Sequence, residues 1–373
     1  THGLSILAAQ RFGSGDRARL RPILSTFLVV LLPLAVLCAA LGVWASGSLL
    51  HLLHTPENIL AFARDYLRII FIGVPFLAAY NLYSALLRAM GDSRAPFYAV
   101  VVSSLANVAL DLWFVAGLGW QVAGAAAATV LSQGAMTLFI LVYAHRRYPL
   151  LRLSMKEPLF RREDFAQGLR FGLPPALQFS VTAGGNIALQ NFMNGFGSHT
   201  VAAITTAYRV DTIMLLPIIN LGSAISTMVA QSKGAGEPQR ARHFWRTGAV
   251  MNLVVSLLLM AVMLLFGGKL VALFGVEAEA AAIGRRFFQR ISLFYVFFGL
   301  ACSMRGTIEG TGRVVYSSAV SIAALLLRIA LSYLLAGAFL NMAIAYAEGL
   351  HWIFMVLCFL PFFLRRDRWA QNS

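Results

Sequence analysis

Long apolar runs recur along the whole chain, and most polar residues fall in short stretches between them. Each run is about 20 residues long, which is enough for a helix to cross the hydrocarbon core of a bilayer. Inside lipid the backbone must satisfy its own hydrogen bonds, so such runs are expected to be helical. The short alternating segments of a membrane β-barrel are not seen. We predict a half-span at residues 1–10 and full spans at residues 23–45, 66–87, 97–116, 122–144, 166–192, 201–231, 247–267, 284–304, 314–336 and 341–364.

Composition supports an all-α polytopic membrane protein. Hydrophobic residues make up 59% of the 373 residues and charged residues only 12%, which is about half the charged fraction of a soluble domain. The net charge is +15, but the basic residues lie in short loops on one side of the predicted helices, so no nucleic-acid partner is expected. Cys38, Cys302 and Cys358 lie in apolar runs without metal-ligand spacing, so neither a disulfide nor a zinc site is expected.

The distribution of Lys and Arg predicts the orientation of the chain. Most of them lie in alternate loops, at residues 11–21, 88–94, 146–162, 233–246, 305–313 and 365–368. Those near the opposite helix ends are Arg64, Arg68, Lys269, Arg285, Arg286 and Arg290. Because cytoplasmic loops are enriched in Lys and Arg, the first set and the C-terminus are predicted to be cytoplasmic. Their basic side chains would contact anionic membrane lipids.

The two halves of the chain repeat at a constant separation of 221 residues. AQRFGSGD at residues 9–16 is matched by AQSKGAGE at residues 230–237, and Gly91 is matched by Gly312. One ungapped offset indicates a duplication whose halves run in the same direction across the membrane. The predicted organisation is an N-lobe at residues 1–144, a cytoplasmic inter-lobe loop at 145–165, a C-lobe at 166–364 and a cytoplasmic tail at 365–373.

The repeat also predicts the size of the complete fold. The C-lobe begins near Ala166, and its first residues have no partner in the first half. Six helices in each lobe would restore the symmetry. The expected fold is therefore a twelve-helix transporter of two pseudo-symmetric lobes, in which this chain has about four and a half helices of the N-lobe and lacks the first one and a half.

Four stretches resemble the MATE (multidrug and toxin extrusion) family of bacterial transporters. They are the two AQxxGxG[DE] loops, LLRAMGDSRAP at residues 86–96, NVALDLWFVAGLGWQVAGAAAATVLSQ at residues 107–133, and AAITTAYRVDTIMLLP with QSKGAGEPQRAR within residues 202–242. The resemblance covers essentially the whole chain. It implies two six-helix lobes facing a central cleft, alternating access, and export of organic solutes, often lipophilic cations, driven by inward Na⁺ or H⁺.

A group of polar residues suggests an ion site in the first half. Asp111 lies within an apolar span, where a carboxylate is costly unless it is paired or hydrated. Ser104, Asn107 and Asp111 are three and four residues apart, so they share one helix face, and Ser104 is a candidate for pocket lining. Asp111 and Thr129 are each nine residues from the turn near Trp120, at similar depth. Their oxygens suit Na⁺, and a desolvated carboxylate equally suits a proton. The simpler alternative is that Asn107 and Asp111 only hydrogen-bond neighbouring helices.

The family resemblance assigns roles to the same residues. In the MATE family the residues that match Asn107, Asp111 and Thr129 belong to the cation site of the N-lobe. The resemblance also implies that Asn81 and Tyr66 line the adjacent pocket, and that a further aspartate of the family would lie upstream of Thr1. We therefore expect Asp111, Asn107 and Thr129 to bind the coupling ion, Na⁺ or H⁺, and we expect no other cofactor.

The second half does not repeat this site. At the same separation, Asn107 corresponds to Arg328 and Asp111 corresponds to Ser332. Asp211 lies about 11 residues into its own span, at a depth that permits a pair with Arg328. Such a pair would be a fixed interhelical contact. If Asp211 is instead free in the cleft, it would attract cationic substrates.

Two further features of the second half bear on coupling and motion. No acid lies within the spans at residues 166–192 and 284–304, where the NorM branch of the MATE family carries them. The resemblance therefore favours coupling through the first lobe, as in the DinF-like branch. Pro174 and Pro175 interrupt the first of these spans, and such breaks often mark bending segments beside a transport path. We expect a hinge there, although such breaks also occur in ordinary membrane helices.

Three other functions remain open from the sequence. An integral membrane enzyme would need clustered acids or a base and nucleophile set, which the sequence lacks, so no catalytic residue is expected. A flippase for lipid-linked oligosaccharide would need a basic cleft, which Arg209 and Arg328 permit. An inactive transporter is the third. The preferred interpretation is a monomeric multi-pass antiporter of the bacterial inner membrane that exchanges Na⁺ or H⁺ for small organic substrates, with Arg209, Asp211 and Arg328 as further pocket candidates.

Overall fold

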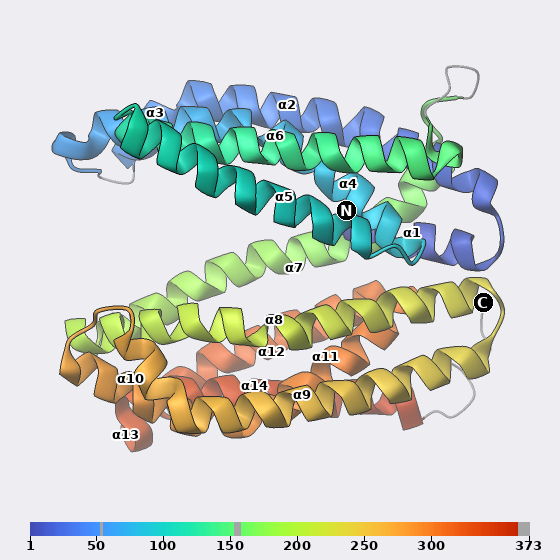
Figure 1. Cartoon of the computed structure of the whole chain (residues 1–373). Coiled ribbons are helices and arrows are strands. Elements are labelled where there is room, and N and C mark those ends of the chain that lie inside the picture. Colours follow the sequence, from blue (N-terminus) through green and yellow to red (C-terminus); the bar gives the residue numbers. More distant parts are fainter. Residues whose placement is uncertain (53–54, 153–157, 365–373) are drawn as a thin grey trace. The chain divides into compact units, whose positions relative to one another are not determined.

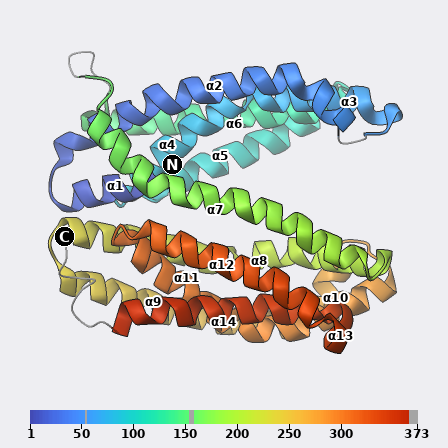
Figure 2. The ribbon, with the colours of Figure 1, turned by 180° about the vertical axis from the view of Figure 1, so that it is seen from behind.

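The computed structural model describes residues 1–52, 55–152 and 158–364, and every regular element within these ranges is helical (Figure 1). Contacts between residues divide the chain into two compact units, unit 1 at Thr1–Leu169 and unit 2 at Arg170–Ser373. Figure 2 shows the same helices from the opposite side. The prediction of an all-α protein is confirmed for the described residues.

Helix α6 is the central helix of unit 1. Helices α3, α4 and α5 all pack against α6, and α2 packs against α3 and α4. Apolar side chains on α1, α2 and α4, among them Leu7, Leu24 and Leu86, are fully buried between these helices. The helices are α1 (His2–Gly13), α2 (Leu20–Leu52), α3 (Glu57–Ile72), α4 (Val74–Ala89), α5 (Arg94–Asp111), α6 (Gln121–Arg147) and the start of α7 (Arg162–Asn194).

Unit 2 is centred on α8, which packs against α9, α10 and α11, while α14 packs against α11 and α12. Phe287, Phe288 and Tyr295 are fully buried in its core. Its helices, after the remainder of α7, are α8 (Ser198–Gly234), α9 (Pro238–Ala272), α10 (Ala278–Ile291), α11 (Tyr295–Gly310), α12 (Val314–Leu334), α13 (Ala336–Phe339) and α14 (Ala343–Leu364).

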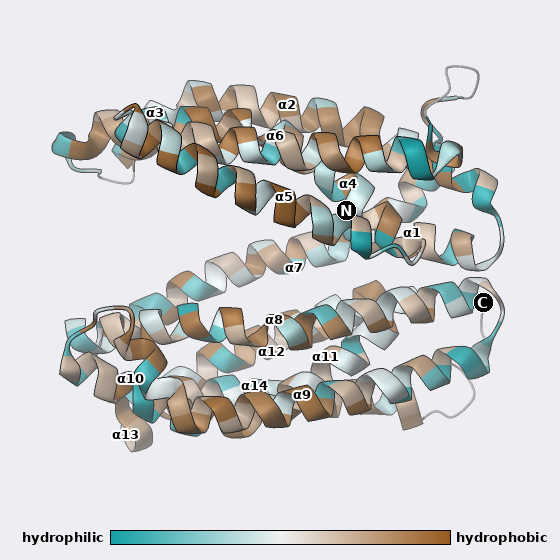
Figure 3. Ribbon diagram, viewed as in Figure 1, coloured by the Kyte–Doolittle hydropathy of each residue, from teal (hydrophilic) through white to brown (hydrophobic). Residues whose placement is uncertain are grey.

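Nine helical stretches of the described chain are long and apolar enough to cross a membrane. Hydrophobic residues cover the middle of helices such as α2, α5 and α9, and hydrophilic residues gather toward helix ends such as the α8–α9 turn (Figure 3). The span predicted at residues 166–192 is helical as part of α7, but α7 is not among the nine. Polar residues including Gln167, Arg170 and Gln178 lower its hydropathy.

Two predicted spans are broken rather than continuous. The span at residues 66–87 divides into α3 and α4 at Gly73, and Pro75 lies in the first turn of α4. Proline has no N–H and cannot continue the hydrogen bonding of the preceding helix. The span at residues 284–304 divides into α10 and α11 around a 3-10 turn that ends at Phe294. Gly73 and Phe294 are 221 residues apart, so both halves bend at the same position of the repeat.

The same separation relates the tight turns of the two units. Left-handed φ angles occur at Gly15 (80°) and Gly236 (69°) and at Gly91 (92°) and Gly312 (87°), and each pair is 221 residues apart. Glycine adopts such angles without the steric cost that a Cβ atom brings. A third pair combines Gly119 (69°) with Leu340 (52°), a non-glycine residue with a positive φ, which is uncommon. The backbone of the turns therefore follows the sequence repeat even where the glycine has been replaced.

Candidate functional site

The α5–α6 hairpin of unit 1 carries the residues predicted to bind the coupling ion. Helix α5 ends at Asp111 and continues as a π-helix over Leu112–Gly117 before the turn into α6. The N–H of Leu118 donates to the carbonyl of Trp113 at 2.9 Å, and the rings of Phe114 and Trp120 stack with centroids 5.1 Å apart. A π-helix widens the backbone and is often found at functional positions. The pattern of apolar residues does not predict it.

Two buried polar atoms at the end of α5 have no partner. Asp111 and Asn107 are half-buried and one helical turn apart. The Oδ1 atom of Asp111 and the Nδ2 atom of Asn107 are inaccessible to solvent and make no hydrogen bond within the part of the chain that the structure describes. Buried polar atoms are normally satisfied, so this pair offers vacant hydrogen-bonding or ligating capacity at the predicted site.

The other predicted residues of unit 1 lie on α3, α4, α5 and α6. Thr129 lies on α6, and its Oγ1 atom donates to the carbonyl of Ala125 at 2.9 Å, which leaves its lone pairs free to accept. Ser104 is exposed on α5, and Asn81 is half-buried on α4. Tyr66 is 39% exposed on α3. Because α3, α4 and α5 all pack on α6, these residues come from neighbouring helices.

Asp92 anchors the start of α5. Its Oδ1 atom accepts hydrogen bonds from the N–H groups of Arg94 and Ala95, both at 3.1 Å, and its Oδ2 atom accepts from the hydroxyls of Tyr143 at 3.0 Å and Tyr148 at 2.8 Å. Partial burial alone would raise the pKa of Asp92, but these four hydrogen bonds together hold it below its usual value. Burial and the bond to Asp92 raise the pKa of Tyr148 to about 12. The carboxylate thus ties α5 to the end of α6.

Unit 2 places a charged network at the position that corresponds to Asn107. Arg328 on α12 forms an ion pair with Glu348 on α14, and the two side chains are 11% and 10% exposed. The hydroxyl of Tyr208 on α8 accepts from Arg328 at 2.9 Å and donates to Glu348 at 3.1 Å. The guanidinium also lies 5.6 Å from the centroid of the Tyr208 ring. The charges are therefore matched within the network, whereas the buried Nε atom of Arg328 makes no hydrogen bond to the described residues.

The pair proposed between Asp211 and Arg328 is not formed. Among the described residues, Arg328 pairs with Glu348, and Asp211 accepts a hydrogen bond from the hydroxyl of Tyr295. Asp211 is 5% exposed and Tyr295 is fully buried. The prediction compared depths only, and helix packing instead brings α14 beside α12. Glu348 was missed, although a lone acid in an apolar run was signal enough to find it.

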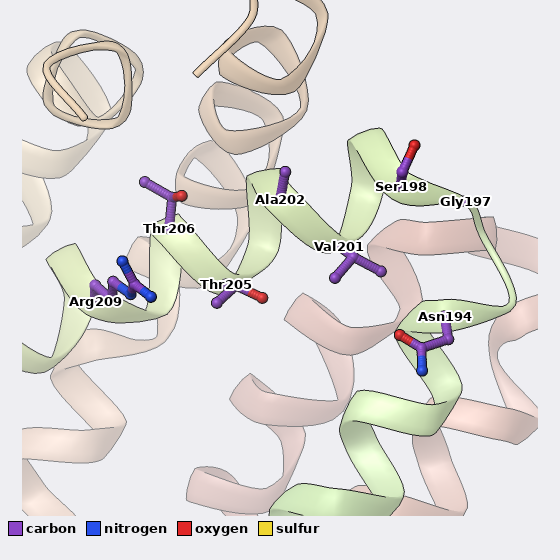
Figure 4. A pocket seen from close by; sticks show the side chains of 8 residues that line it. All are labelled: Asn194, Gly197, Ser198, Val201, Ala202, Thr205, Thr206 and Arg209. Carbon is purple, nitrogen blue, oxygen red and sulfur yellow. The ribbon is translucent and has the colours of Figure 1, made fainter. Parts of the chain in front are cut away.

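Unit 2 also has a shallow cavity of about 600 Å³, open on one side, along the first three turns of α8 (Figure 4). It includes Arg209, whereas Asp211 is buried on another face of the helix. Gly197, with a φ of 87°, forms the turn from α7 into α8 and brings Asn194 to the cavity. The lining residues are Asn194, Gly197, Ser198, Val201, Ala202, Thr205, Thr206 and Arg209.

Pro174 and Pro175 lie inside the continuous helix α7. They cannot donate to the carbonyls of Arg170 and Phe171, so two helical hydrogen bonds are missing there. The boundary between the units falls between Leu169 and Arg170, just before this weakened segment.

Comparison with known proteins gives consistent matches along the chain. The family model described as MatE matches residues 1–113 and 174–334. The probable multidrug resistance protein YoeA of Bacillus subtilis is 31% identical over 330 residues, which are 87% of this chain and 71% of that protein. The probable multidrug resistance protein YpnP of the same organism is 32% identical over 311 residues, which are 83% of this chain and 69% of that protein.

A solved structure described as the outward-facing conformation of a multidrug resistance MATE family transporter of the MOP superfamily has the same fold. Its TM-score is 0.92 at 21% sequence identity, and the match covers 99% of this chain and 84% of that chain.

Proposed function

Because this chain belongs to the MatE family of multidrug and toxin extrusion transporters, we propose that it exports small organic molecules in exchange for an inward-moving cation. The protein is a helical multi-pass membrane transporter and not an enzyme. Cation coupling is general in the family. The coupling residue that we propose for this chain is Asp111, with Asn107 and Thr129 as the neighbouring ligands.

The observation that carries the proposal is the unsatisfied carboxylate oxygen of Asp111. A buried carboxylate in a membrane span needs a proton, a metal ion or a basic partner. Within the described residues Asp111 has no basic partner. Asn107 offers an amide whose two ends exchange by rotation, so its carbonyl oxygen is able to face the same ion. Thr129 adds a hydroxyl oxygen from α6.

Either Na⁺ or H⁺ satisfies this arrangement. Carboxylate, amide and hydroxyl oxygens suit a hard cation whose remaining ligands are waters. A proton would instead turn Asp111 into a neutral donor, which removes the cost of the buried charge. In both cases the loaded and empty forms of the site differ by one charge. Ion binding would shift the balance between inward-open and outward-open states if the two states bind the ion with different affinity.

We further propose that units 1 and 2 act as the two lobes of a twelve-helix transporter. Alternating access then needs a bending segment, and Pro174 and Pro175 in α7 are our candidates. The unit boundary a few residues earlier supports this assignment. Asn81, Tyr66 and Ser104 are proposed to line the solute path in unit 1.

The test is gradient-driven efflux by the full chain in proteoliposomes, with Na⁺ and pH varied separately. We expect Asp111→Asn to abolish ion-driven export without loss of folded protein. Asp65→Asn, which removes an exposed acid of α3 in the same unit, is the matched control and should export normally. Unchanged export by Asp111→Asn would contradict the proposal.

A lipid-linked oligosaccharide flippase is not favoured by the structure of unit 2. Such a protein would need several free basic groups in its cleft. Arg328 is paired with Glu348, which leaves Arg209 as the basic residue of the cavity. Accumulation of lipid-linked intermediates in a deletion strain, with unchanged dye efflux, would reverse this preference.

A further inference from the structure

Arg209 has an unusual environment for a charged residue of an apolar helix. It lies about 16 Å along α8 from Ser198, at a rise of 1.5 Å per residue. It is exposed at the cavity of unit 2. In the described part of the chain its guanidinium forms no ion pair, hydrogen bond or ring contact. An arginine at such depth normally has a partner or faces a water-filled space.

Among the described residues, no acid of this region pairs with Arg209. Asp211, two residues along α8, is buried and accepts from Tyr295. Glu277 and Glu279 lie 3.4 and 4.0 Å from the ring nitrogens of His199. None of the residues that line the cavity is acidic. Within the described residues, the charge of Arg209 therefore has no acidic partner.

The remaining polar lining consists of groups that are able to donate hydrogen bonds, although its hydroxyls are also able to accept them. Ser198, Thr205 and Thr206 supply hydroxyls along the same helix as Arg209 (Figure 4). The carboxamide oxygen of Asn194 accepts from Gln190 at 3.3 Å, so its N–H groups stay available. The first turn of α8 has no side-chain cap, and its backbone N–H groups have no partners within the helix.

A single positive charge surrounded by donors selects an anion. Guanidinium binds carboxylate and phosphate through two parallel hydrogen bonds, and these charge-assisted bonds are stronger than neutral ones. Val201 and Ala202 form an apolar part of the lining. A volume of about 600 Å³ is in the range of small-molecule sites. We propose that this cavity binds the carboxylate or phosphate group of an amphipathic anion, with Arg209 as the charged contact.

Such an anion has two sources, an exported solute or an anionic lipid. That the anion is cargo rests on the export function proposed above, whereas its binding to Arg209 does not. Equilibrium binding therefore tests the site without requiring transport.

The binding experiment uses two xanthene dyes of similar ring size, carboxyfluorescein as the anion and rhodamine 6G as the cation. Fluorescence anisotropy of the full chain in phosphatidylcholine nanodiscs measures both affinities. We expect Arg209→Gln to weaken the binding of carboxyfluorescein about tenfold, which corresponds to the loss of roughly one charge-assisted hydrogen bond. The affinity for rhodamine 6G should not change. Arg209→Lys should retain part of the affinity. Arg286→Gln, an exposed arginine of the same unit outside the cavity, is the matched control.

A second arm replaces part of the phosphatidylcholine with phosphatidylglycerol. If lipid is the natural ligand, phosphatidylglycerol weakens dye binding to the wild type but not to Arg209→Gln. If a solute is the natural ligand, phosphatidylglycerol does not change the difference in carboxyfluorescein affinity between the wild type and Arg209→Gln. The inference is overturned if carboxyfluorescein does not bind, or if Arg209→Gln and Arg286→Gln bind it equally well.

Efflux measurements separate this inference from the proposed function. Gradient-driven export of rhodamine 6G with no binding of carboxyfluorescein would overturn the anion site and leave cation-coupled export intact. Arg209-dependent binding of carboxyfluorescein, with no gradient-driven movement of either dye, would support the anion site and contradict export.

Discussion

Asn107 and Asp111 in unit 1 and the corresponding Arg328 and Ser332 in unit 2 occupy equivalent helices of a duplicated sequence, but their surroundings are opposite. In unit 1 a carboxylate oxygen and an amide nitrogen are buried without partners. In unit 2 the guanidinium is neutralised by Glu348 and hydrogen-bonded to Tyr208. A site with vacant capacity is able to exchange an ion, whereas a matched pair resists change because separating it leaves a buried charge. The difference supports ion coupling by unit 1 and a fixed framework in unit 2.

The largest expected effect is on the stability of unit 2. Glu348→Gln should lower the free energy of unfolding by about 3–5 kcal/mol, because Arg328 is left as an uncompensated buried charge. The double variant Arg328→Gln with Glu348→Gln should recover most of that loss, since neither charge remains. Thermal unfolding of the purified protein measures both. If Glu348→Gln is as stable as the wild type, the ion pair between Arg328 and Glu348 does not stabilise unit 2 as proposed.

The next effect sharpens the description of unit 1. At 100 times its dissociation constant, the coupling ion should stabilise the wild type by about 2.7 kcal/mol, because it binds the folded protein only. Asp111→Asn should lose this stabilisation while keeping its stability without the ion. Thermal unfolding against Na⁺ at constant pH, and against pH without Na⁺, identifies which ion acts. An Asp111→Asn variant that is stabilised as much as the wild type would place the ion elsewhere.

Asp92 allows a smaller test of the same comparison, because unit 2 has Arg313 at the corresponding position. Asp92→Ala should cost about 1–2 kcal/mol, the effect of losing a helix-capping carboxylate. The folded-state pKa of Asp92 is lowered, so its contribution is present above the unfolded pKa of about 3.9 and is lost as pH falls through the folded value. Unfolding midpoints of wild type and variant should therefore converge in strong acid. A constant difference at all pH values would contradict this assignment.

The smallest effect concerns the equivalent turns at Gly119 and Leu340. Leu340 has a φ of 52°, and such a conformation costs a non-glycine residue of order 1–3 kcal/mol, partly offset by the greater flexibility of glycine in the unfolded chain. Leu340→Gly should thus raise stability by about 1 kcal/mol, and Gly119→Leu should lower it by a similar amount. Chemical or thermal unfolding of the two variants measures these changes. Destabilisation by Leu340→Gly would show that side-chain packing outweighs the backbone cost.

Much of the fold followed from local features of the chain. Apolar run lengths predicted the helices, and the repeated glycine-containing motifs coincide with the repeated turns, because both depend on neighbouring residues. The break at Phe294 was missed, since a run of apolar residues does not reveal where a span bends, whereas Pro75 marks the break beside Gly73 in the sequence. The weak hydropathy of α7 was also overlooked, although Gln167, Arg170 and Gln178 were visible in the sequence.

The candidate sites also differ in whether they depend on one helix or on the packing of several helices. The one-turn spacing of Asn107 and Asp111 is a property of a single helix, so the sequence by itself determined that they share a face. The partner of Arg328 depends on which helices pack together, and only the tertiary structure placed Glu348 rather than Asp211 beside it. The cavity at Arg209 likewise depends on the turn at Gly197 and on packing around α8. The spacing of residues in the sequence determines which of them share a face of one helix, whereas contacts between distant helices depend on the packing of the whole unit.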